Sequence, residues 1–257
     1  MRPPRDPRGR AARFAGRRIY ITGAASGIGR ATAGLLAGEG ATLALVDIDG
    51  AGLASVARET GGTAFVVDLA SGEAIDASVA AAGGALGGLD GVINCAGLGE
   101  GTRLAGLEPS LWAHVLAINL SAPYRVCRAA LAWFEREPRA SIVNVASGEA
   151  LLPSGAGAPA YAASKGGLIS LTKALAADLA PRVRANVVCP GLADTAMTAG
   201  FLHGGDGSLA AAAIARYALR RAADPIEIAE AIAFLASDDA SYVTGITLAA
   251  DGGRSFH

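Results

Sequence analysis

The segment from Tyr161 to Lys165 places a weak acid and a cation where they could move a proton. The two residues are four positions apart, so on a helix their side chains lie on one face. Lys165 is one of only two lysines in a chain that otherwise uses arginine as its cation. A neighbouring ammonium group favours the phenolate form of tyrosine, whose pKa in a free peptide is about 10. We therefore expect Tyr161 to act as a general acid and base with a lowered pKa.

A glycine-rich turn at residues 22–29 is the second chemical signal. It follows an apolar run and precedes an Ala- and Leu-rich segment, which is the strand, turn and helix context of a phosphate-binding loop. Glycines there permit a sharp turn and a close approach of backbone to phosphate, and the N-terminus of the helix offers unpaired N–H groups. The turn predicts a dinucleotide-binding site.

Asp47 ends the second apolar run, at the position where a carboxylate can accept hydrogen bonds from an adenosine ribose. The same charge would repel a 2'-phosphate, and the turn from Gly23 to Gly29 contains no Lys or Arg to offset it. This pattern favours NAD over NADP. Asp49 fits the alternative role of a helix-capping acid better than Asp47 does.

Composition excludes several other classes of function. The formal net charge of -1 argues against a nucleic-acid surface, and no apolar run predicts a membrane span or a signal peptide. Three dispersed cysteines fit reduced thiols in a cytoplasmic protein better than a disulfide framework or a metal site. Residues 1–12 are rich in Arg and Pro, and we expect them to form a disordered tail on one domain that spans residues 13–257.

Seven short apolar runs alternate with longer Ala- and Leu-rich segments. The predicted strands are 18–22, 42–46, 64–67, 91–95, 141–146, 184–189 and 247–250. The predicted helices are 27–37, 50–59, 72–85, 109–118, 120–135, 159–180 and 225–236. Continuous apolar strands are typical of a parallel sheet buried on both faces. We therefore predict a single α/β domain with a doubly wound parallel sheet, helices on both faces, and a ligand crevice at the carboxyl ends of the strands.

Together, the motifs resemble those of a known family. They are the glycine turn, Asn94 to Gly97, Asn119, Ser147, the Tyr161 and Lys165 pair, and the Cys-Pro-Gly segment at 189–191. This set resembles the short-chain dehydrogenase/reductase family, in the branch whose chains are about as long as this one, and the resemblance extends from Phe14 onward. It implies a Rossmann-type fold, an NAD(P) cofactor, and hydride transfer between the nicotinamide and a carbonyl or alcohol carbon.

The resemblance also implies a role for each matching residue. Tyr161 would exchange the proton with the substrate oxygen, and Lys165 would lower its pKa and hold the nicotinamide ribose. Ser147 would bind the same substrate oxygen, and Asn119 would hold a water that links Lys165 to solvent. Besides Tyr161 and Lys165, the expected cofactor contacts are Gly23, Ser26, Gly27, Ile28, Gly29, Asp47, Asp68, Leu69, Asn94, Ala96, Gly97, Pro190, Gly191 and Thr195.

The substrate is the least determined part of the prediction. The segments expected to shape its pocket are 98–104, 148–158 and a mobile loop at 192–216. Leu151, Leu152, Phe201, Leu202 and Leu209 suggest an apolar pocket for a cyclic, aromatic or aliphatic secondary alcohol. Glu149 could bind a second hydroxyl group or a cation, or could face solvent. The predicted substrate contacts are Ser147, Glu149, Leu152 and Tyr161.

The sequence therefore favours an NAD-dependent oxidoreductase that interconverts a secondary alcohol and a ketone. Two alternatives stay open: an NADP-dependent ketoreductase similar to 3-oxoacyl reductases, and a dinucleotide-binding regulator without turnover. An epimerase or dehydratase of the related longer branch fits less well, because this chain lacks their extra substrate domain. The resemblance implies a homotetramer or homodimer, and the small residues Ala162, Gly166 and Ser170 could form a face for helix packing between subunits.

Overall fold

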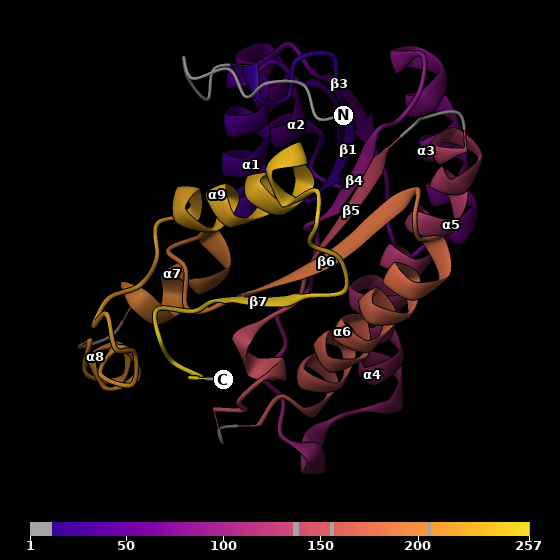
Figure 1. Cartoon of the computed structure of the whole chain (residues 1–257). Helices are drawn as coiled ribbons and strands as arrows, with labels where there is room; N and C mark the ends of the chain where they lie inside the picture. The colour runs from indigo at the N-terminus through magenta and orange to yellow at the C-terminus, as the bar shows by residue number, and fades with distance from the viewer. Residues whose placement is uncertain (1–11, 136–138, 155–156, 205–206, 257) are drawn as a thin grey trace.

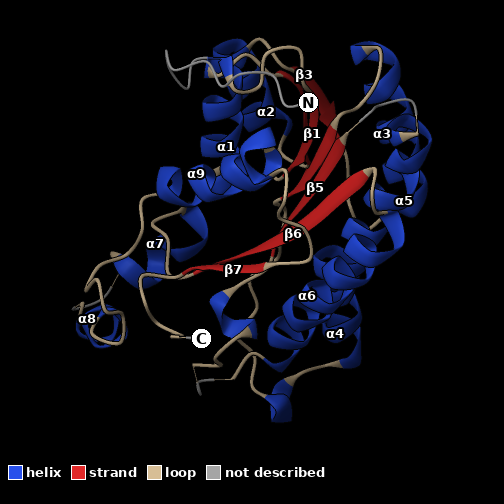
Figure 2. Cartoon of the chain, in the orientation of Figure 1, coloured by secondary structure: helices blue, strands red, loops and turns tan. Residues whose placement is uncertain are grey.

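The computed structural model describes residues 12–135, 139–154, 157–204 and 207–256, so the predicted tail at 1–12 lies almost wholly outside the described residues. A parallel sheet of seven strands forms the centre of the molecule, in the order β3-β2-β1-β4-β5-β6-β7 (Figure 2). The strands are β1 Arg18–Thr22, β2 Thr42–Asp47, β3 Thr63–Val66, β4 Gly91–Asn94, β5 Ala140–Val145, β6 Val183–Pro190 and β7 Thr247–Ala250. The doubly wound α/β fold is thus confirmed.

Helices cover both faces of this sheet (Figure 1). They are α1 Gly27–Gly38, α2 Gly50–Thr60, α3 Gly72–Leu86, α4 Pro109–Leu116, α5 Ala122–Phe134, α6 Pro159–Leu179, α7 Ala196–Leu202, α8 Ser208–Ile214 and α9 Pro225–Ala236. Helices α1, α2 and α9 lie on one face, and α3, α5 and α6 lie on the other.

Alternation along β1 shows how the strands hold the two layers together. Ile19 and Ile21 pack into the core under α1 and α9, whereas Tyr20 points to the opposite core under α3 and α5. All three side chains are fully buried. A strand buried on both faces has no solvent-facing side, which is why these strands appear in the sequence as unbroken apolar runs.

The strand order reverses between β1 and β4, so the connections that follow these two strands leave toward opposite faces of the sheet. Side chains at their carboxyl ends therefore border an open crevice, where ligands bind in folds of this kind. The strand-to-helix connections that enter this crevice carry the motifs singled out in the sequence.

Two regions differ from the sequence-based prediction. The segment 192–216, expected to be a mobile loop, contains the short helices α7 and α8. Each has seven residues, too few to show a helical hydrophobic period, although the hydroxyl and backbone groups of Thr195 and Thr198 form a capping box at the start of α7. Between α4 and α5 the chain does not break but continues through a π-helical turn at Ala117–Ser121.

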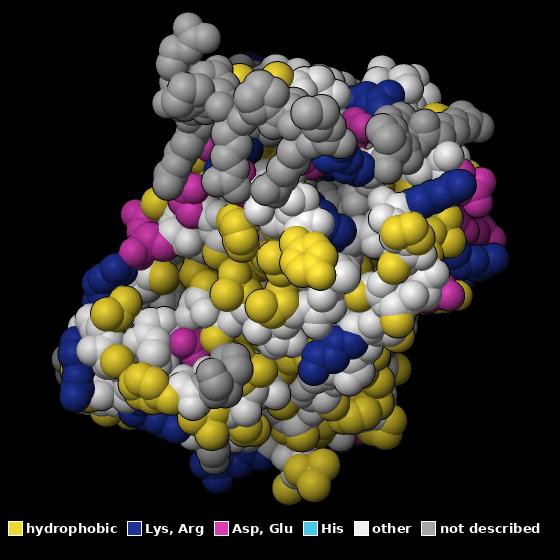
Figure 3. All heavy atoms as spheres, in the orientation of Figure 1, with side chains coloured by type: hydrophobic (Ala, Val, Ile, Leu, Met, Phe, Trp, Pro, Cys, Tyr) yellow, Lys and Arg dark blue, Asp and Glu magenta, His cyan; other side chains and the backbone are white. Residues whose placement is uncertain are grey.

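Hydrophobic side chains gather on the surface between α9 and the edge strand β7 (Figure 3). Ile226 and Phe234 on α9, and Tyr242 and Ile246 between α9 and β7, are large hydrophobic residues with exposed side chains. The expected homodimer or homotetramer stays a prediction. None of the described helices is long and apolar enough to cross a membrane.

Candidate active site

A cavity of about 360 Å³ lies at the carboxyl ends of β1, β2 and β4. It brings together eleven of the predicted cofactor contacts: Gly23, Ser26, Gly27, Ile28, Gly29, Asp47, Asp68, Leu69, Ala96, Gly97 and Thr195. The sequence analysis did not predict the seven residues that complete the lining, which are Ile48, Val67, Cys95, Leu98, Ile118, Ala196 and Met197. Most of these are apolar residues next to a predicted contact in the sequence. An apolar side chain carries no polar group that would indicate ligand binding.

The glycine turn brings two backbone segments too close together for side chains. Gly23 has φ +69°, and a Cβ there would lie 2.7 Å from the backbone nitrogen of Ala96. A Cβ on Gly29 would overlap the carbonyl oxygen of Gly23. Ser26 precedes α1 as its N-cap residue and makes no side-chain cap hydrogen bond, so it leaves the first N–H groups of the helix to another acceptor. This geometry fits the pyrophosphate of a dinucleotide.

The carboxylate of Asp47 is held in a fixed orientation at the edge of the same cavity. Its Oδ2 accepts from the backbone N–H of Ala25 at 3.1 Å, and its Oδ1 accepts from the N–H of Asp49 at 3.1 Å. The side chain of Asp49 instead accepts from the N–H groups of Ala51 and Gly52. Asp49 is therefore the cap of α2, as predicted, and Asp47 is the acid that faces the ligand site.

A second cavity, of about 370 Å³, adjoins the first and contains the predicted catalytic groups. The two cavities share Ile28, Cys95, Gly97, Thr195 and Met197 as lining residues. Ser147, Tyr161 and Lys165 line the second cavity, together with Pro190 and Gly191. A ligand as long as a dinucleotide could thus extend from Asp47 to the side chains that carry the proton chemistry.

Tyr161 and Lys165 lie one turn apart on α6, and the pKa of Tyr161 is not lowered as the sequence analysis predicts. The Nζ of Lys165 lies 5.9 Å from the centroid of the Tyr161 ring and donates to the carbonyl oxygen of Val145 at 2.8 Å. Burial raises the pKa of Tyr161, and the nearby charge of Glu149 raises it further, while the hydroxyl of Ser147 lowers it. Burial lowers the pKa of Lys165 to about 8. The predicted lowering of the pKa of Tyr161 is therefore wrong in this structure, because burial disfavours the charged phenolate.

Asn119 lies in the π-helical turn between α4 and α5, and its side chain is fully buried. Its Oδ1 accepts from the N–H of Leu98 at 2.7 Å, and its Nδ2 donates to the carbonyl oxygen of Leu98 and to Oγ of Ser164. A Cβ placed on Gly97 would lie 3.1 Å from Nζ of Lys165 and 3.5 Å from Oδ1 of Asn119. Asn119, Gly97 and Lys165 thus meet at one point, although Asn119 itself does not line either cavity.

Asn94 is the predicted cofactor contact that the structure places elsewhere. Its side chain is buried beneath the crevice, and its Nδ2 donates to Oδ1 of Asn144 at 2.8 Å. Asn144 in turn donates to the hydroxyl of Thr172 on α6. Asn94 therefore connects β4, β5 and α6 rather than lining the cofactor cavity, because the alternation of side chains along β4 turns it into the core.

The apolar residues expected to form the substrate pocket do not line it. None of Leu151, Leu152, Phe201, Leu202 and Leu209 lines the cavity that contains Tyr161, and Leu152, Phe201 and Leu209 are exposed. The wall mixes apolar side chains such as Val145, Leu192 and Met197 with the polar side chains of Glu100, Glu149, Ser154, Tyr217 and Arg254. Of the predicted substrate contacts, Ser147, Glu149 and Tyr161 lie together and Leu152 does not.

The three cysteines are free thiols, and Cys95 and Cys189 lie near Lys165. Burial raises the pKa of Cys95 and of Cys127 to about 12, and that of Cys189 to about 11. These raised pKa values favour the protonated thiols at neutral pH, whereas a nucleophilic cysteine needs a lowered pKa. Within the described ranges no three side chains of His, Cys, Asp or Glu come together as a metal site.

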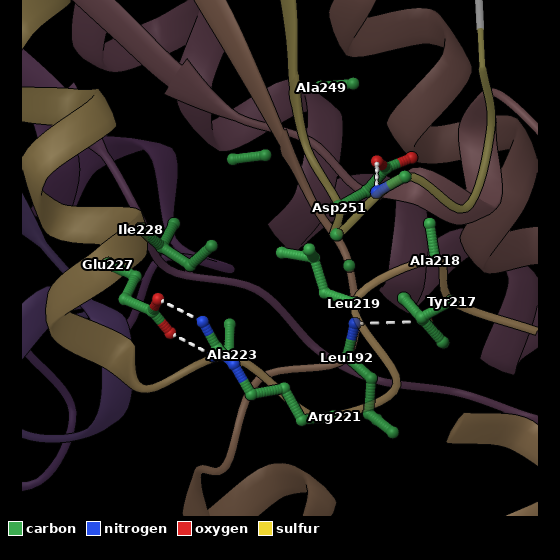
Figure 4. Close-up of a pocket in the computed structure, with 14 residues that line it drawn as sticks. Leu192, Tyr217, Ala218, Leu219, Arg221, Ala223, Glu227, Ile228, Ala249 and Asp251 are labelled. Carbon is green, nitrogen blue, oxygen red and sulfur yellow. Dashed lines mark hydrogen bonds and ion pairs between the residues drawn. The ribbon is translucent and has the colours of Figure 1, made fainter. Parts of the chain in front are cut away.

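A third cavity, of about 420 Å³, adjoins the catalytic one beside β7 (Figure 4). Tyr217, Gly191 and Leu192 separate the two, and the hydroxyl of Tyr217 accepts from the N–H of Leu192 at 3.1 Å. An exposed ion pair between Arg221 and Glu227 borders this third cavity. It contains none of the catalytic groups, so it is not the reaction site despite its size.

Comparison with known proteins agrees with this geometry. Residues 23–255 match a family model described as enoyl-(acyl carrier protein) reductase. The chain is 36% identical to 2-(S)-hydroxypropyl-CoM dehydrogenase 3 of Xanthobacter autotrophicus, over 92% of this chain and 96% of that protein. It is 36% identical to the 3-oxoacyl-[acyl-carrier-protein] reductase of Thermotoga maritima, over 94% of this chain and 98% of that protein.

Solved structures show the same relationship. A short-chain dehydrogenase/reductase from Brucella melitensis, described as a glucose/ribitol dehydrogenase, is 35% identical with a TM-score of 0.87, over 95% of this chain and 98% of that chain. The aldohexose dehydrogenase of Thermoplasma acidophilum is 29% identical with a TM-score of 0.87, over 97% of both chains. With its parallel sheet, glycine turn and paired Tyr161 and Lys165, this chain belongs to the short-chain dehydrogenase/reductase family of NAD(P)-dependent oxidoreductases.

Proposed function

We propose that the protein is an NAD-dependent dehydrogenase that interconverts a secondary alcohol and a ketone. The observation that carries the proposal is the continuity of two cavities, one bordered by Asp47 and the other by Ser147, Tyr161 and Lys165. The residues around the first cavity fit a dinucleotide, because the glycine turn and the free N-terminus of α1 match a pyrophosphate and Asp47 can accept hydrogen bonds from a ribose.

The nicotinamide, when bound, accepts or donates the hydride; the side chains of this chain position the substrate and move its proton. Ser147 can donate a hydrogen bond to the substrate oxygen, since its Oγ already accepts one from the N–H of Glu149 at 3.1 Å. Tyr161 holds the proton that this oxygen gains on reduction or loses on oxidation. Lys165, almost fully buried, supplies a cation beside the phenolate that forms.

A ketoreductase that uses NADP is the second candidate, supported by the 36% identity to a 3-oxoacyl-[acyl-carrier-protein] reductase. Its chemistry would use the same side chains in the direction of reduction. It differs in cofactor, and Asp47 argues against it, because no Lys or Arg lines the cavity beside that carboxylate among the described residues.

The experiment is a screen of secondary alcohols and ketones with NAD and with NADP, followed by the absorbance of the reduced nicotinamide. Tyr161→Phe removes the transferable proton and little else, so turnover should fall about 10²- to 10⁴-fold. The affinity for NAD, measured by calorimetry, should change little. A loss of less than about tenfold would show that Tyr161 is not the acid and base. Tight NAD binding without turnover on any substrate would instead favour a non-catalytic regulator.

A further inference from the structure

One wall of the catalytic cavity carries an ion pair that the proposed proton chemistry does not use. The Nη2 of Arg254 lies 3.1 Å from Oε1 of Glu149, and both residues line the cavity with Ser147 and Tyr161. Glu149 follows Ser147 by two positions in the chain and lines the same cavity as Tyr161. The pair is therefore close to the reacting groups.

The last turn of the chain is built to deliver Arg254 to this wall. Oδ1 of Asp251 accepts from the N–H groups of Gly253 and Arg254, and Oδ2 accepts from the hydroxyl of Ser255 at 2.6 Å. Gly252 and Gly253 have φ of +62° and +75°, a conformation that other residues rarely adopt. The turn is thus fixed both by hydrogen bonds and by its glycines.

The guanidinium group is nearly enclosed, with 4% of its side chain exposed. Its Nη2 also donates to the carbonyl oxygen of Leu152 at 2.6 Å. Burying an arginine is costly unless its charge is balanced, and Glu149 balances it here. The ion pair is thus held in a fixed position in the wall of the cavity that contains Ser147 and Tyr161.

The pair offers a substrate both a donor and an acceptor without a net charge. Among the described residues, Arg254 forms its side-chain hydrogen bonds through Nη2, and its Nη1 lies over Gly148, where a Cβ would be 3.4 Å away. Each oxygen of Glu149 has one partner, Arg254 or the N–H of Ser154, and a carboxylate oxygen can accept more than one hydrogen bond. A hydroxyl group both donates and accepts, so it matches the pair.

Charge argues against an acidic substrate at this wall. A carboxylate would compete with Glu149 for Arg254 and would also face Glu100, which lines the same cavity. We propose that Glu149 and Arg254 bind a second, uncharged hydroxyl group of the substrate, which is therefore a diol, a polyol or the corresponding hydroxy ketone. This inference rests on the proposed function, because Ser147 and Tyr161 define the first oxygen.

A series on one ring tests the substrate class with the wild-type protein and NAD. The compounds are cyclohexanol, cyclohexane-1,2-diol, cyclohexane-1,4-diol and 4-hydroxycyclohexanecarboxylate. One additional hydrogen bond should raise kcat/KM of at least one diol about fivefold or more above that of cyclohexanol. The acid should be a poorer substrate than that diol. Equal values for cyclohexanol and both diols, or a preference for the acid, would overturn the proposal.

Paired variants separate recognition from folding. Glu149→Gln with Arg254→Gln removes both charges together, so no unpaired charge is left buried, and it should reduce the diol-to-cyclohexanol ratio to within about twofold. The control is Arg221→Gln with Glu227→Gln, which removes the exposed ion pair beside the third cavity (Figure 4) and should leave the ratio unchanged. A ratio that survives the first double variant would also refute the role of the pair.

Calorimetry distinguishes failure of this inference from failure of the proposed function. Each ring compound is titrated into the wild-type protein saturated with NAD, and then into both double variants. In one outcome no alcohol is oxidised, but the diol binds at least fivefold more tightly than cyclohexanol to the wild type and not to the Glu149 and Arg254 variant. In that case the proposed oxidation fails and the proposed hydroxyl site stands. If alcohols are oxidised without any preference for a diol, the proposed function stands and the inference fails.

Discussion

Replacing Asp47 with asparagine should remove most of the preference for NAD over NADP. The carboxylate is held at the edge of the cofactor cavity by two backbone N–H groups, those of Ala25 and Asp49, so it cannot easily turn away from an approaching phosphate. Asparagine keeps the shape but has one acceptor oxygen instead of two, so it loses one of these two hydrogen bonds together with the charge. Only the lost charge distinguishes the two cofactors, so the ratio of kcat/KM for NAD to that for NADP isolates its effect.

The magnitude follows from Coulomb's law. Two unit charges about 4 Å apart repel by about 4 kcal/mol at an effective dielectric constant of about 20. Screening by salt and by the water at this open cavity reduces that value, and one third of it, about 1.4 kcal/mol, already corresponds to a tenfold change. We expect the wild type to favour NAD at least tenfold in kcat/KM. The Asp47→Asn variant should narrow that preference to a few fold or less.

The assay compares kcat/KM for the two cofactors with one alcohol at one salt concentration. Asp49→Asn is the matched control, because it also removes one negative charge, two positions further along the chain. The side chain of Asp49 caps α2 and does not line the cavity. Adding Ser26→Arg to Asp47→Ala should narrow or invert the preference, since Ser26 is exposed and makes no cap hydrogen bond that would be lost. A wild type that prefers NADP, or an Asp49→Asn variant with the larger effect, would refute the assignment.

Two further predictions concern the turn and the buried lysine. Gly29→Ala should abolish dinucleotide binding in calorimetry, because the new Cβ would overlap the carbonyl oxygen of Gly23. Gly34 lies in the same helix with open space around it, so Gly34→Ala should keep dinucleotide binding and should stabilise the fold by about 0.5–1 kcal/mol in urea unfolding. Equal dinucleotide affinities of the two variants would contradict the close packing of the turn. Burial lowers the pKa of Lys165 to about 8, so between about pH 8 and pH 10 the unfolded chain holds more protons than the folded one. As the pH rises through this range, the free energy of unfolding of the wild type should increase by about 1–3 kcal/mol relative to that of Lys165→Met. A difference between the two proteins that is constant from pH 7 to pH 10 would show that the lysine is not desolvated.

Most of the architecture could be predicted from the sequence, because the hydrophobic pattern and the capping residues of most segments match the strands and helices that they form. Strand β1 and helix α9 have the predicted bounds, and Asp49 caps α2 as expected. The catalytic groups come from different elements, with Ser147 after β5 and Tyr161 and Lys165 on α6, yet they line one cavity. In a parallel sheet the carboxyl ends of all strands meet at one edge, so residues placed there converge without any signal of contact in the sequence.

What the sequence could not predict depends on side-chain direction, on burial or on distant contacts. Asn94 carries a motif residue, but the alternation along β4 turns its amide toward Asn144. The pKa of Tyr161 was expected to fall, and the depth of its burial reverses the sign. Both depend on the environment of a side chain, which a motif does not specify.

Arg254 shows the limit most clearly, because nothing near it in the sequence suggests a substrate contact. Its guanidinium reaches the carbonyl oxygen of Leu152, 102 positions earlier, only because the chain returns along β7 and turns at Asp251. The same return of the chain places Arg254 beside Glu149. Glu149, unlike Arg254, is close to Ser147 in the sequence. We therefore propose that residues at the strand ends carry the reaction and that the turn at Asp251 contributes to the choice of substrate, a division of roles that the diol series tests.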